Sequence, residues 1–310
     1  MPHYFVAIFL MLIGITTCPA ADDPTVMQAL EDIENYKVLP STQLLPFLKA
    51  QQLKLRSQIA LIVDYRDGTL LYGRNIDKPA PIASLTKLMT AMIILDARQP
   101  LSEAVEIDAE DKDYLKFSRS RLKPGILVTR EDLLWMALVA SENRAAAALA
   151  RTYPGGTPAF VQAMNIKARQ LHMSRTRFTD ATGLDQDNVS TARDLLMMMN
   201  AAYGYPLIRQ ISTTREQIIF PLQGPRLLKY RNTNHLIRSQ HWNIGLSKTG
   251  YINEAGYCLL MQAEVNQRPL LIILLNSAGL RSKFGDANRI SKWLQEAEQR
   301  ALHKNKMANS

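Results

Sequence analysis

The sequence predicts an α+β fold, within the broader α/β class, in which an antiparallel sheet is covered by helices and carries a helical subdomain. Strand patterns occupy residues 57–75 and 243–277, whereas residues 101–205 are mostly helical in pattern. Consecutive strands joined by short turns pair antiparallel, and the apolar face of such a sheet must be buried under helices. With 310 residues, of which 47% are hydrophobic, the chain can bury a core of that size.

The chain begins with an apolar run, residues 5–15, which has the length of a signal-peptide hydrophobic segment and is too short to span a bilayer. Small residues follow at Ala20 and Ala21, so we predict a secretory signal peptide over residues 1–21 and an exported mature chain with no transmembrane span. The first residues lack the Lys or Arg that such signals usually carry. Cys18 offers a lesser alternative, lipid attachment, although Thr17 is larger than that signal usually accepts.

The composition restricts cofactors and partners. A formal charge of +9 suits an anionic partner such as a cell-wall polymer. The Lys and Arg residues are scattered without runs or interleaved aromatic residues, so nucleic acid is not expected. The five histidines have no metal-ligand spacing, and we predict neither a metal nor another cofactor. Once the signal peptide is removed, Cys258 is the only cysteine and can form no internal disulfide.

The first strands of the domain have the pattern of a hairpin. Residues 22–56 form a lead-in segment without recognisable chemistry, and an alternation of aliphatic residues begins at Ser57. Asp67-Gly68 is a hairpin turn signal, and residues 69–75 form the returning strand. Prolines then lead into an apolar helix over about residues 84–98.

Helix signals fill residues 101–205. Thr129 with Asp132 has the pattern of a capping box. Thr157-Pro158 suggests an N-cap and a first-turn proline for a helix over residues 159–171, and Ser190-Thr191 precedes another helix. These signals predict a helical subdomain between the two groups of strands.

Three aliphatic strands follow the helical region, over residues 243–251, 256–265 and 269–277. An apolar stripe from Ile290 to Ala301 then marks a closing amphipathic helix. We therefore predict one domain over residues 57–301, followed by a polar tail over residues 302–310.

One helix carries a lysine that packing does not require. Ser84 and Lys87 stand three residues apart at the start of an almost wholly apolar helix, so their side chains share one face. Negative charge is favoured at a helix N-terminus, and an amine beside a hydroxyl there suits a nucleophilic serine with a lysine base. The alternative is a capping serine beside a lysine whose amine reaches solvent, and this stretch alone favours that alternative.

Two further polar stretches interrupt apolar segments. Ser141 and Asn143 lie where the chain turns between two apolar helices, and Lys248-Thr249-Gly250 begins a strand. Each stretch has a structural alternative, because the first pair can cap a helix, Lys248 can protect a sheet edge and Gly250 can form a bulge. The order Ser-x-x-Lys, Ser-x-Asn and Lys-Thr-Gly nevertheless matches the motif set of class A β-lactamases and penicillin-binding proteins.

The sequence resembles the low-molecular-mass penicillin-binding proteins, which are serine D-alanyl-D-alanine peptidases, and most closely the penicillin-binding protein 7 type endopeptidases. The resemblance runs from about Ser57 to Gln295. It is carried by Pro81–Ala91, Ser141–Ala147, Tyr153–Gly156, Asn188–Leu195, Arg231–Leu236 and Lys248–Gly256. It implies the β-lactamase/penicillin-binding-protein-like transpeptidase fold, peptidoglycan peptide cross-bridges as the substrate, β-lactam antibiotics as covalent inhibitors, and a periplasmic location.

The resemblance and the chemistry of acyl transfer together assign the reacting groups. Ser84 would attack the carbonyl of the penultimate D-Ala and form an acyl-enzyme, with Lys87 as general base. Ser141 would relay a proton to the leaving group. Lys87 can act as a base only when it is neutral, and we expect burial and the second cation, Lys248, to lower its pKa.

The remaining motif residues are expected to hold the substrate. By resemblance, Asn143 orients the lysine base and bonds the substrate backbone. Lys248 and Thr249 would hold the terminal carboxylate, and Gly250 would leave room for an extended peptide. The backbone N–H groups of Ser84 and Tyr251 would form the oxyanion hole.

Three rival functions are less consistent with particular residues. A class A β-lactamase needs a glutamate in the loop that positions hydrolytic water, and residues 180–188 contain aspartates but no glutamate. A Ser-His-Asp hydrolase would want Gly-x-Ser-x-Gly, but the nearest string ends in Thr249. A non-catalytic wall-binding or β-lactam-sensing protein would not need the intact Ser84 and Lys87.

A D-alanyl-D-alanine carboxypeptidase is the main alternative, because the motifs are common to both activities. The longer family members carry a C-terminal β domain and an anchor helix, whereas few residues follow Gln295 here. This difference favours an endopeptidase that cleaves D-Ala–diaminopimelate cross-bridges.

Overall fold

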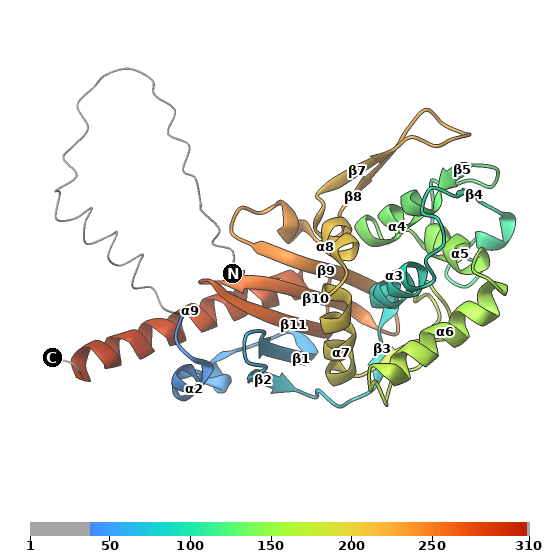
Figure 1. The fold of residues 1–310 in the computed structure, drawn as a ribbon. Helices are drawn as coiled ribbons and strands as arrows, with labels where there is room; N and C mark the ends of the chain where they lie inside the picture. Colours follow the sequence, from blue (N-terminus) through green and yellow to red (C-terminus); the bar gives the residue numbers. More distant parts are fainter. Residues whose placement is uncertain (1–37, 309–310) are drawn as a thin grey trace, which may run out of the picture. The chain divides into compact units, whose positions relative to one another are not determined.

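The computed structural model describes residues 38–308 (Figure 1). The predicted signal peptide, Cys18 and most of the lead-in segment therefore lie outside the described residues. From Leu39 onward the chain forms one compact unit. Within the described part, no helix combines the length and the apolar character needed to cross a membrane.

The centre of the fold is a five-stranded antiparallel sheet, which confirms the predicted fold class. The strands are β1 (Ser57–Asp64), β2 (Leu70–Arg74), β9 (Asn243–Ile252), β10 (Gly256–Val265) and β11 (Arg268–Ser277). Their order is β2-β1-β11-β10-β9. Ile62 of β1 is paired with Ile272 of β11, so the N-terminal hairpin and the C-terminal meander join in one sheet. The strand with the Lys-Thr-Gly motif, β9, forms an edge of that sheet.

The sheet is buried on both faces, which explains its long aliphatic strands. Ile59, Leu61 and Val63 belong to the larger of two apolar cores, and the alternating Ala60 and Ile62 belong to the other. The larger core is shared with the helices between β3 and β9, whereas the smaller one is covered by the closing helix α9 (Ser282–Ala308) (Figure 1).

The helices between β2 and β9 occupy just under half of that segment, with loops and short strands between them. They are α3 (Thr86–Asp96), α4 (Arg130–Val139), α5 (Asn143–Arg151), α6 (Gly156–Gln170), α7 (Ala192–Tyr203) and α8 (Pro206–Thr213). A 3₁₀ turn, η3 (Ala83–Leu85), leads directly into α3. Short 3₁₀ turns also occur at η4 (Ala109–Asp111) and η5 (His235–Arg238).

Three small two-stranded sheets flank these helices. They pair β3 (Ala80–Pro81) with β6 (Val189–Ser190), β4 (Ala104–Glu106) with β5 (Leu127–Thr129), and β7 (Glu216–Ile219) with β8 (Leu228–Arg231). Figure 1 shows the β7–β8 hairpin reaching out beyond α8 on the side of the molecule that carries α4 and β5.

The helix starts test the capping predictions. Thr129 and Asp132 form a complete capping box at α4, and the Thr191 side chain accepts a hydrogen bond from the Asp194 N–H at the start of α7. The prediction for α6 is wrong by two residues, because its N-cap is Gly155 and not Thr157. Gly155 has φ +84°, and a Cβ built there would lie 2.8 Å from Cβ of Ala159, so only glycine fits this entry turn.

The described end of the lead-in segment packs onto the sheet. It forms α2 (Ser41–Leu44) and the turns η1 (Leu45–Phe47) and η2 (Ala50–Gln52). Its Leu44, Leu53 and Leu55 enter the smaller core. The buried Arg268 forms ion pairs with Asp64 and Glu298 and donates to the Leu39 carbonyl, so one guanidinium joins three segments of the chain.

Candidate active site

A cleft of about 490 Å³ opens where η3, the α4–α5 turn and β9 meet. Six of the predicted site residues line it: Ser84, Ser141, Asn143, Thr249, Gly250 and Tyr251. Lys87 and Lys248 lie just beneath, exposed to solvent by 0% and 1%. The structure thus brings together three motifs that are separated by up to 166 positions of sequence.

Ser84 sits in the 3₁₀ turn ahead of α3, on a backbone fixed by its neighbours. Ala83 before it has φ +48°, in the left-handed region that a residue with a Cβ seldom adopts. Gly183 packs against this turn so closely that a Cβ built on it would lie 2.0 Å from the Ala83 carbonyl oxygen. The Ser84 side chain therefore has a defined direction into the cleft.

The Lys87 amine has three oxygen neighbours. Its Nζ lies 3.0 Å from Ser84 Oγ, 2.7 Å from Asn143 Oδ1 and 2.6 Å from the Thr182 carbonyl oxygen. Complete burial contradicts the alternative of a lysine reaching solvent. Burial lowers the pKa of Lys87 to about 8, against the carboxylates of Asp180, Glu142 and Asp113, which raise it.

Lys248 forms the second buried amine of the site. Its Nζ donates to Ser141 Oγ at 2.8 Å and to the Thr249 carbonyl at 2.9 Å, so it is not a lysine protecting a sheet edge. Burial, and then the charges of Lys87 and Lys283, hold the pKa of Lys248 well below its usual value. The expected effect of burial is therefore present at Lys87, and the repulsion between the two buried amines lowers the pKa of Lys248.

The α4–α5 turn directs Ser141 and Asn143 inward. Ser141 has φ +58°, and the N-cap of α5 is Glu142, whose carboxylate accepts a hydrogen bond from the Arg144 N–H. Neither predicted residue is therefore occupied with capping the helix. The Asn143 amide donates from Nδ2 to Ser118 Oγ at 2.9 Å, which turns its oxygen toward Lys87.

The edge strand β9 runs tightly against the serine turn. A Cβ built on Gly250 would lie 3.1 Å from both the Ile82 carbonyl oxygen and the Ser84 amide nitrogen. Gly250 thus gives room for the serine turn itself, and the ladder between β9 and β10 stays regular beside it, with no bulge at this position. The next residue, Tyr251, stacks on Tyr257 of β10 at 4.2 Å between ring centroids.

Sequence reasoning missed the loop that supports Lys87. The Asp180 carboxylate accepts hydrogen bonds from the backbone N–H groups of Thr182, Gly183 and Asp185 at 2.6 to 2.9 Å. These bonds aim the Thr182 carbonyl at Lys87. The Asp-x-Thr-Gly string was visible in the sequence, but its contact with the lysine spans 95 positions.

Lys283, at the start of α9, was also missed. It lines the cleft although only 3% of it is exposed, and its amine lies 5.1 Å from the Tyr257 ring centroid and 5.2 Å from that of Phe284. Burial lowers the pKa of Lys283 to about 8. The sequence offered no signal for it, because a lysine in a first helical turn is ordinarily a surface residue. Thr233 is a further lining residue, and its hydroxyl accepts a hydrogen bond from Thr249 at 2.6 Å.

The groups required by rival mechanisms are arranged differently. Ser247 is buried and its hydroxyl accepts a hydrogen bond from Asn234, so it is a structural residue of β9. The His235 ring lies 3.9 Å from the Phe284 ring, in an aromatic contact. Among residues 38–308, no group of three or more His, Cys, Asp or Glu side chains could hold a metal ion.

The fold and the cleft define a serine acyl-transfer protein of the penicillin-binding type. In overall structure the chain is similar to the Streptomyces K15 DD-transpeptidase, with a TM-score of 0.73 and 27% identity over 78% of this chain and 97% of that one. It is also similar to penicillin-binding protein D2 from Listeria monocytogenes, solved in a cefotaxime-bound form, with a TM-score of 0.65 and 28% identity over 78% of this chain and 98% of that one.

Sequence comparison gives the family. Residues 47–279 match the D-alanyl-D-alanine carboxypeptidase family of serine peptidases, and the chain belongs to this family. A relative from Pseudomonas aeruginosa, a D-alanyl-D-alanine endopeptidase, is 46% identical over 251 residues, which cover 81% of each chain. The predicted resemblance, the fold and the class of enzyme, a serine-type D-Ala-D-Ala peptidase, are therefore confirmed.

Proposed function

We propose that the protein is a D-alanyl-D-alanine endopeptidase that cleaves the D-Ala–diaminopimelate cross-bridges of peptidoglycan through an acyl-enzyme on Ser84. The contact of 3.0 Å between Lys87 Nζ and Ser84 Oγ carries the proposal, because it joins a nucleophile to a buried amine. The endopeptidase relative, at 46% identity, favours a cross-bridge over a free peptide end as the substrate.

The three neighbours of Lys87 suit a general base. A neutral amine has two N–H donors and one lone pair. Asn143 Oδ1 and the Thr182 carbonyl can only accept, so together they take both N–H groups. The lone pair is then left for the Ser84 hydroxyl, and it can take the serine proton as Oγ attacks the D-Ala carbonyl.

Ser141 and Lys248 supply the proton that the leaving amine needs. Ser141 donates its hydroxyl proton to the departing nitrogen and recovers one from Lys248, to which it is already hydrogen-bonded. In the second half of the reaction, water attacks the acyl-enzyme and passes a proton through Ser141 back to Lys248. Lys87 returns its proton to Ser84 Oγ as the acyl group leaves. Both lysines thus end each cycle as they began.

The other motif residues bind the substrate. The backbone N–H groups of Ser84 and Tyr251 hold the oxyanion. Lys248 and Thr249 hold the carboxylate beyond the scissile bond, and this anion raises the pKa of Lys248 that burial lowers, which favours the charged amine. Lys283 adds a further amine to the lining of the cleft.

β-Lactam antibiotics would acylate the same serine, and the resulting acyl-enzyme would be hydrolysed slowly. The bound cefotaxime of the Listeria relative supports acylation by this class of drug. The loop beside Lys87 has no glutamate, and the Asp180 carboxylate is engaged by the backbone of its own loop. The Asp180 carboxylate is therefore not free to activate water, and the loop has no glutamate in its place, so we propose inhibition and not β-lactamase turnover. Prompt hydrolysis of benzylpenicillin would contradict this.

A carboxypeptidase remains the second candidate, because the matched family bears that description. Both activities need the same catalytic groups and differ in the size of the group that leaves from the scissile bond. We further propose export to the periplasm, where cross-linked peptidoglycan is found, by means of the signal predicted at residues 1–21.

The test has two arms. Cross-linked muropeptide dimers incubated with the protein should yield monomers, and dimers that persist while pentapeptide monomers lose D-Ala would establish the carboxypeptidase instead. A fluorescent penicillin should label the wild-type chain and the exposed-serine control Ser102→Ala, but not Ser84→Ala. A non-catalytic wall-binding protein would show no covalent band in any of them.

A further inference from the structure

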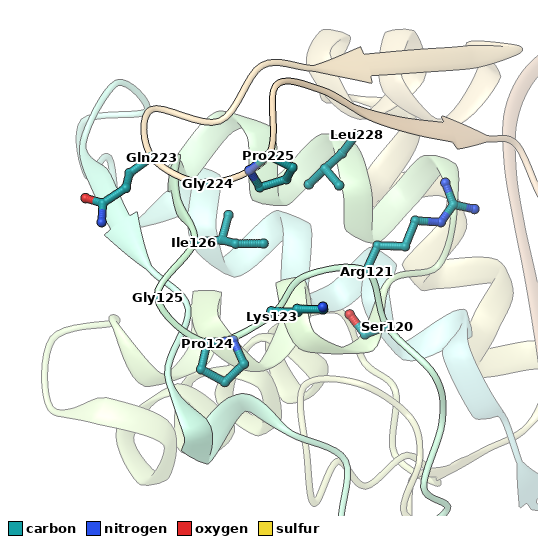
Figure 2. A pocket seen from close by; sticks show the side chains of 10 residues that line it. All are labelled: Ser120, Arg121, Lys123, Pro124, Gly125, Ile126, Gln223, Gly224, Pro225 and Leu228. Carbon is teal, nitrogen blue, oxygen red and sulfur yellow. The ribbon is translucent and has the colours of Figure 1, made fainter.

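A second concavity, of about 700 Å³, lies beside the active site and is used by no step above. We call it the hairpin groove, because the tip of the β7–β8 hairpin forms one wall and the loop of residues 120–126 forms the other (Figure 2). Its lining residues are Ser120, Arg121, Lys123, Pro124, Gly125, Ile126, Gln223, Gly224, Pro225 and Leu228.

The two walls are fastened to each other at both ends. At the tip, the Leu127 N–H donates to the Gln223 carbonyl at 3.0 Å, and the Leu222 N–H donates to the Leu127 carbonyl at 2.8 Å. At the base, the Arg121 guanidinium donates to the Lys229 carbonyl. The hairpin groove is therefore a fixed part of the fold and not a gap under a freely moving hairpin.

Both walls start from the active-site cleft. Ser120 of the loop is two residues from Ser118, which accepts the hydrogen bond from Asn143. On the other wall, β8 ends two residues before Thr233, which lines the cleft next to Thr249. Leu228, the groove residue of β8, is five residues from Thr233, and five extended residues span at most about 18 Å, so a peptide chain leaving the cleft reaches the groove within about five residues.

The groove leads away from the leaving-group side of the cleft. Ser141, the proposed donor to the leaving amine, belongs to the turn that Ser118 braces through Asn143. Thr249, the proposed contact of the carboxylate beyond the scissile bond, touches the Thr233 end of the other wall. The part of the substrate beyond the scissile bond is thus directed toward the hairpin groove.

The lining combines apolar walls with positive charge. Ile126 of the loop faces Pro225 and Leu228 of the hairpin across the groove (Figure 2), and Arg121 and Lys123 are its charged residues. None of the ten lining residues is acidic. This surface suits a short peptide that carries carboxylates and small alkyl side chains, which is the chemistry of a peptidoglycan stem.

We propose that the hairpin groove binds the stem peptide on the leaving side of the cross-bridge. The inference rests on the endopeptidase function proposed above. It explains how the protein would select cross-bridges over free peptide ends as substrates. The leaving group of a carboxypeptidase is a single D-Ala, which ends at its carboxylate and cannot reach the groove. The leaving group of an endopeptidase is a whole stem, which continues into it.

The experiment reverses one charge in the groove. Lys123 is exposed, and Lys123→Glu places a carboxylate against the anionic stem without disturbing the Arg121 brace. Lys78→Glu, at another exposed lysine remote from both cavities, makes the same charge change as a control. The kcat/KM for purified muropeptide dimers and the rate of acylation by fluorescent penicillin are measured for each protein.

The groove proposal predicts that Lys123→Glu lowers kcat/KM for dimers about tenfold or more, mainly through KM, because one charged contact is reversed. Penicillin, which has no stem, should acylate it as fast as it acylates the wild type. Pro225→Glu on the opposite wall should repeat this pattern, and Lys78→Glu should show wild-type values.

Other results overturn the proposal. Dimer cleavage unchanged in both groove variants would mean that the groove serves another partner, such as a second protein. An equal loss of dimer cleavage and penicillin acylation would mean that the groove supports only the α4–α5 turn. A wild-type protein that is labelled by penicillin but leaves dimers intact would overturn the endopeptidase function itself, which is a distinguishable failure.

Discussion

The carbonyl oxygen of Thr182 accepts a hydrogen bond of 2.6 Å from Nζ of Lys87, the shortest of the three contacts of that amine. The carbonyl is held there by Asp180, whose carboxylate bonds the N–H groups of Thr182 and Gly183. One loop thus fixes the position of the proposed base and, through a carboxylate, its proton affinity.

The rate of acylation should rise with pH and reach half of its maximum near pH 8. Burial lowers the pKa of Lys87 to about 8. Only the neutral amine can accept the Ser84 proton, so activity is lost as the pH falls below that pKa and gained as it rises through it. Penicillin acylation measured from pH 6 to 10 would show the curve, and a flat profile would contradict the assignment of Lys87 as base.

Asp180→Asn should move that curve to lower pH and also lower its plateau. The Asp180 carboxylate raises the pKa of Lys87, so its removal leaves more of the amine neutral at a given pH. The plateau falls because Asn cannot accept from all three N–H groups that hold the Thr182 carbonyl in place. Asp187→Asn, at an exposed position of the same loop, is the control. A loss of rate with no shift in pH would leave Asp180 with a purely structural role.

Gly183→Ala should reduce acylation by about 100-fold or more, because it displaces the serine turn by an appreciable part of an ångström. The added Cβ would lie 2.0 Å from the Ala83 carbonyl oxygen and 2.9 Å from the Ser84 amide nitrogen. Gly68→Ala is a matched control, since Gly68 has a similar φ of +71° but no atom within 4 Å of such a Cβ. If the two variants lose the same activity at equal folded fraction, backbone conformation and not crowding is responsible.

Lys283→Met should raise KM for peptide substrates about tenfold and change kcat less, because a contact to the substrate carboxylate is lost. Lys283 lines the cleft, and no carboxylate is bonded to its amine in the described part of the chain. The exposed Lys292, on the same helix, provides the control Lys292→Met. Unchanged KM for a D-Ala-terminated peptide would remove Lys283 from the binding site.

Arg268→Leu should destabilise the fold by about 3–5 kcal/mol, since it leaves the buried Glu298 without its ion-pair partner and Asp64 with only the partly exposed Arg66. Arg268 is fully buried and pairs with Asp64 and Glu298. Urea unfolding measures the loss. Replacing the exposed Arg193, which pairs with Asp77 at the surface, should cost less than about 1 kcal/mol.

The sequence was most informative where local pattern and chemistry coincide. The strands that begin at Ser57 and Asn243 can be recognised by their continuous aliphatic residues. The catalytic motifs can be recognised by polar residues in apolar surroundings. The support of Lys87 by Thr182 and the inward position of Lys283 depend on contacts between distant segments, which no local pattern records. The sequence could indicate that Lys87 and Lys248 interact, but the two buried amines titrate as a coupled pair, and a motif does not record which of them takes the first proton.

Two residues of the cleft, Ala83 and Ser141, hold a left-handed backbone although neither is glycine. Such conformations cost on the order of 1–3 kcal/mol each and persist only where the surroundings impose them. Ala83→Gly would relax its turn and raise the free energy of unfolding, but it would also free the backbone that directs the Ser84 hydroxyl. Ser141→Gly would relax the other turn and remove the relay hydroxyl itself. Thermal stability and catalytic precision are therefore opposed at these two positions, and selection for a more robust enzyme would have to proceed elsewhere in the chain.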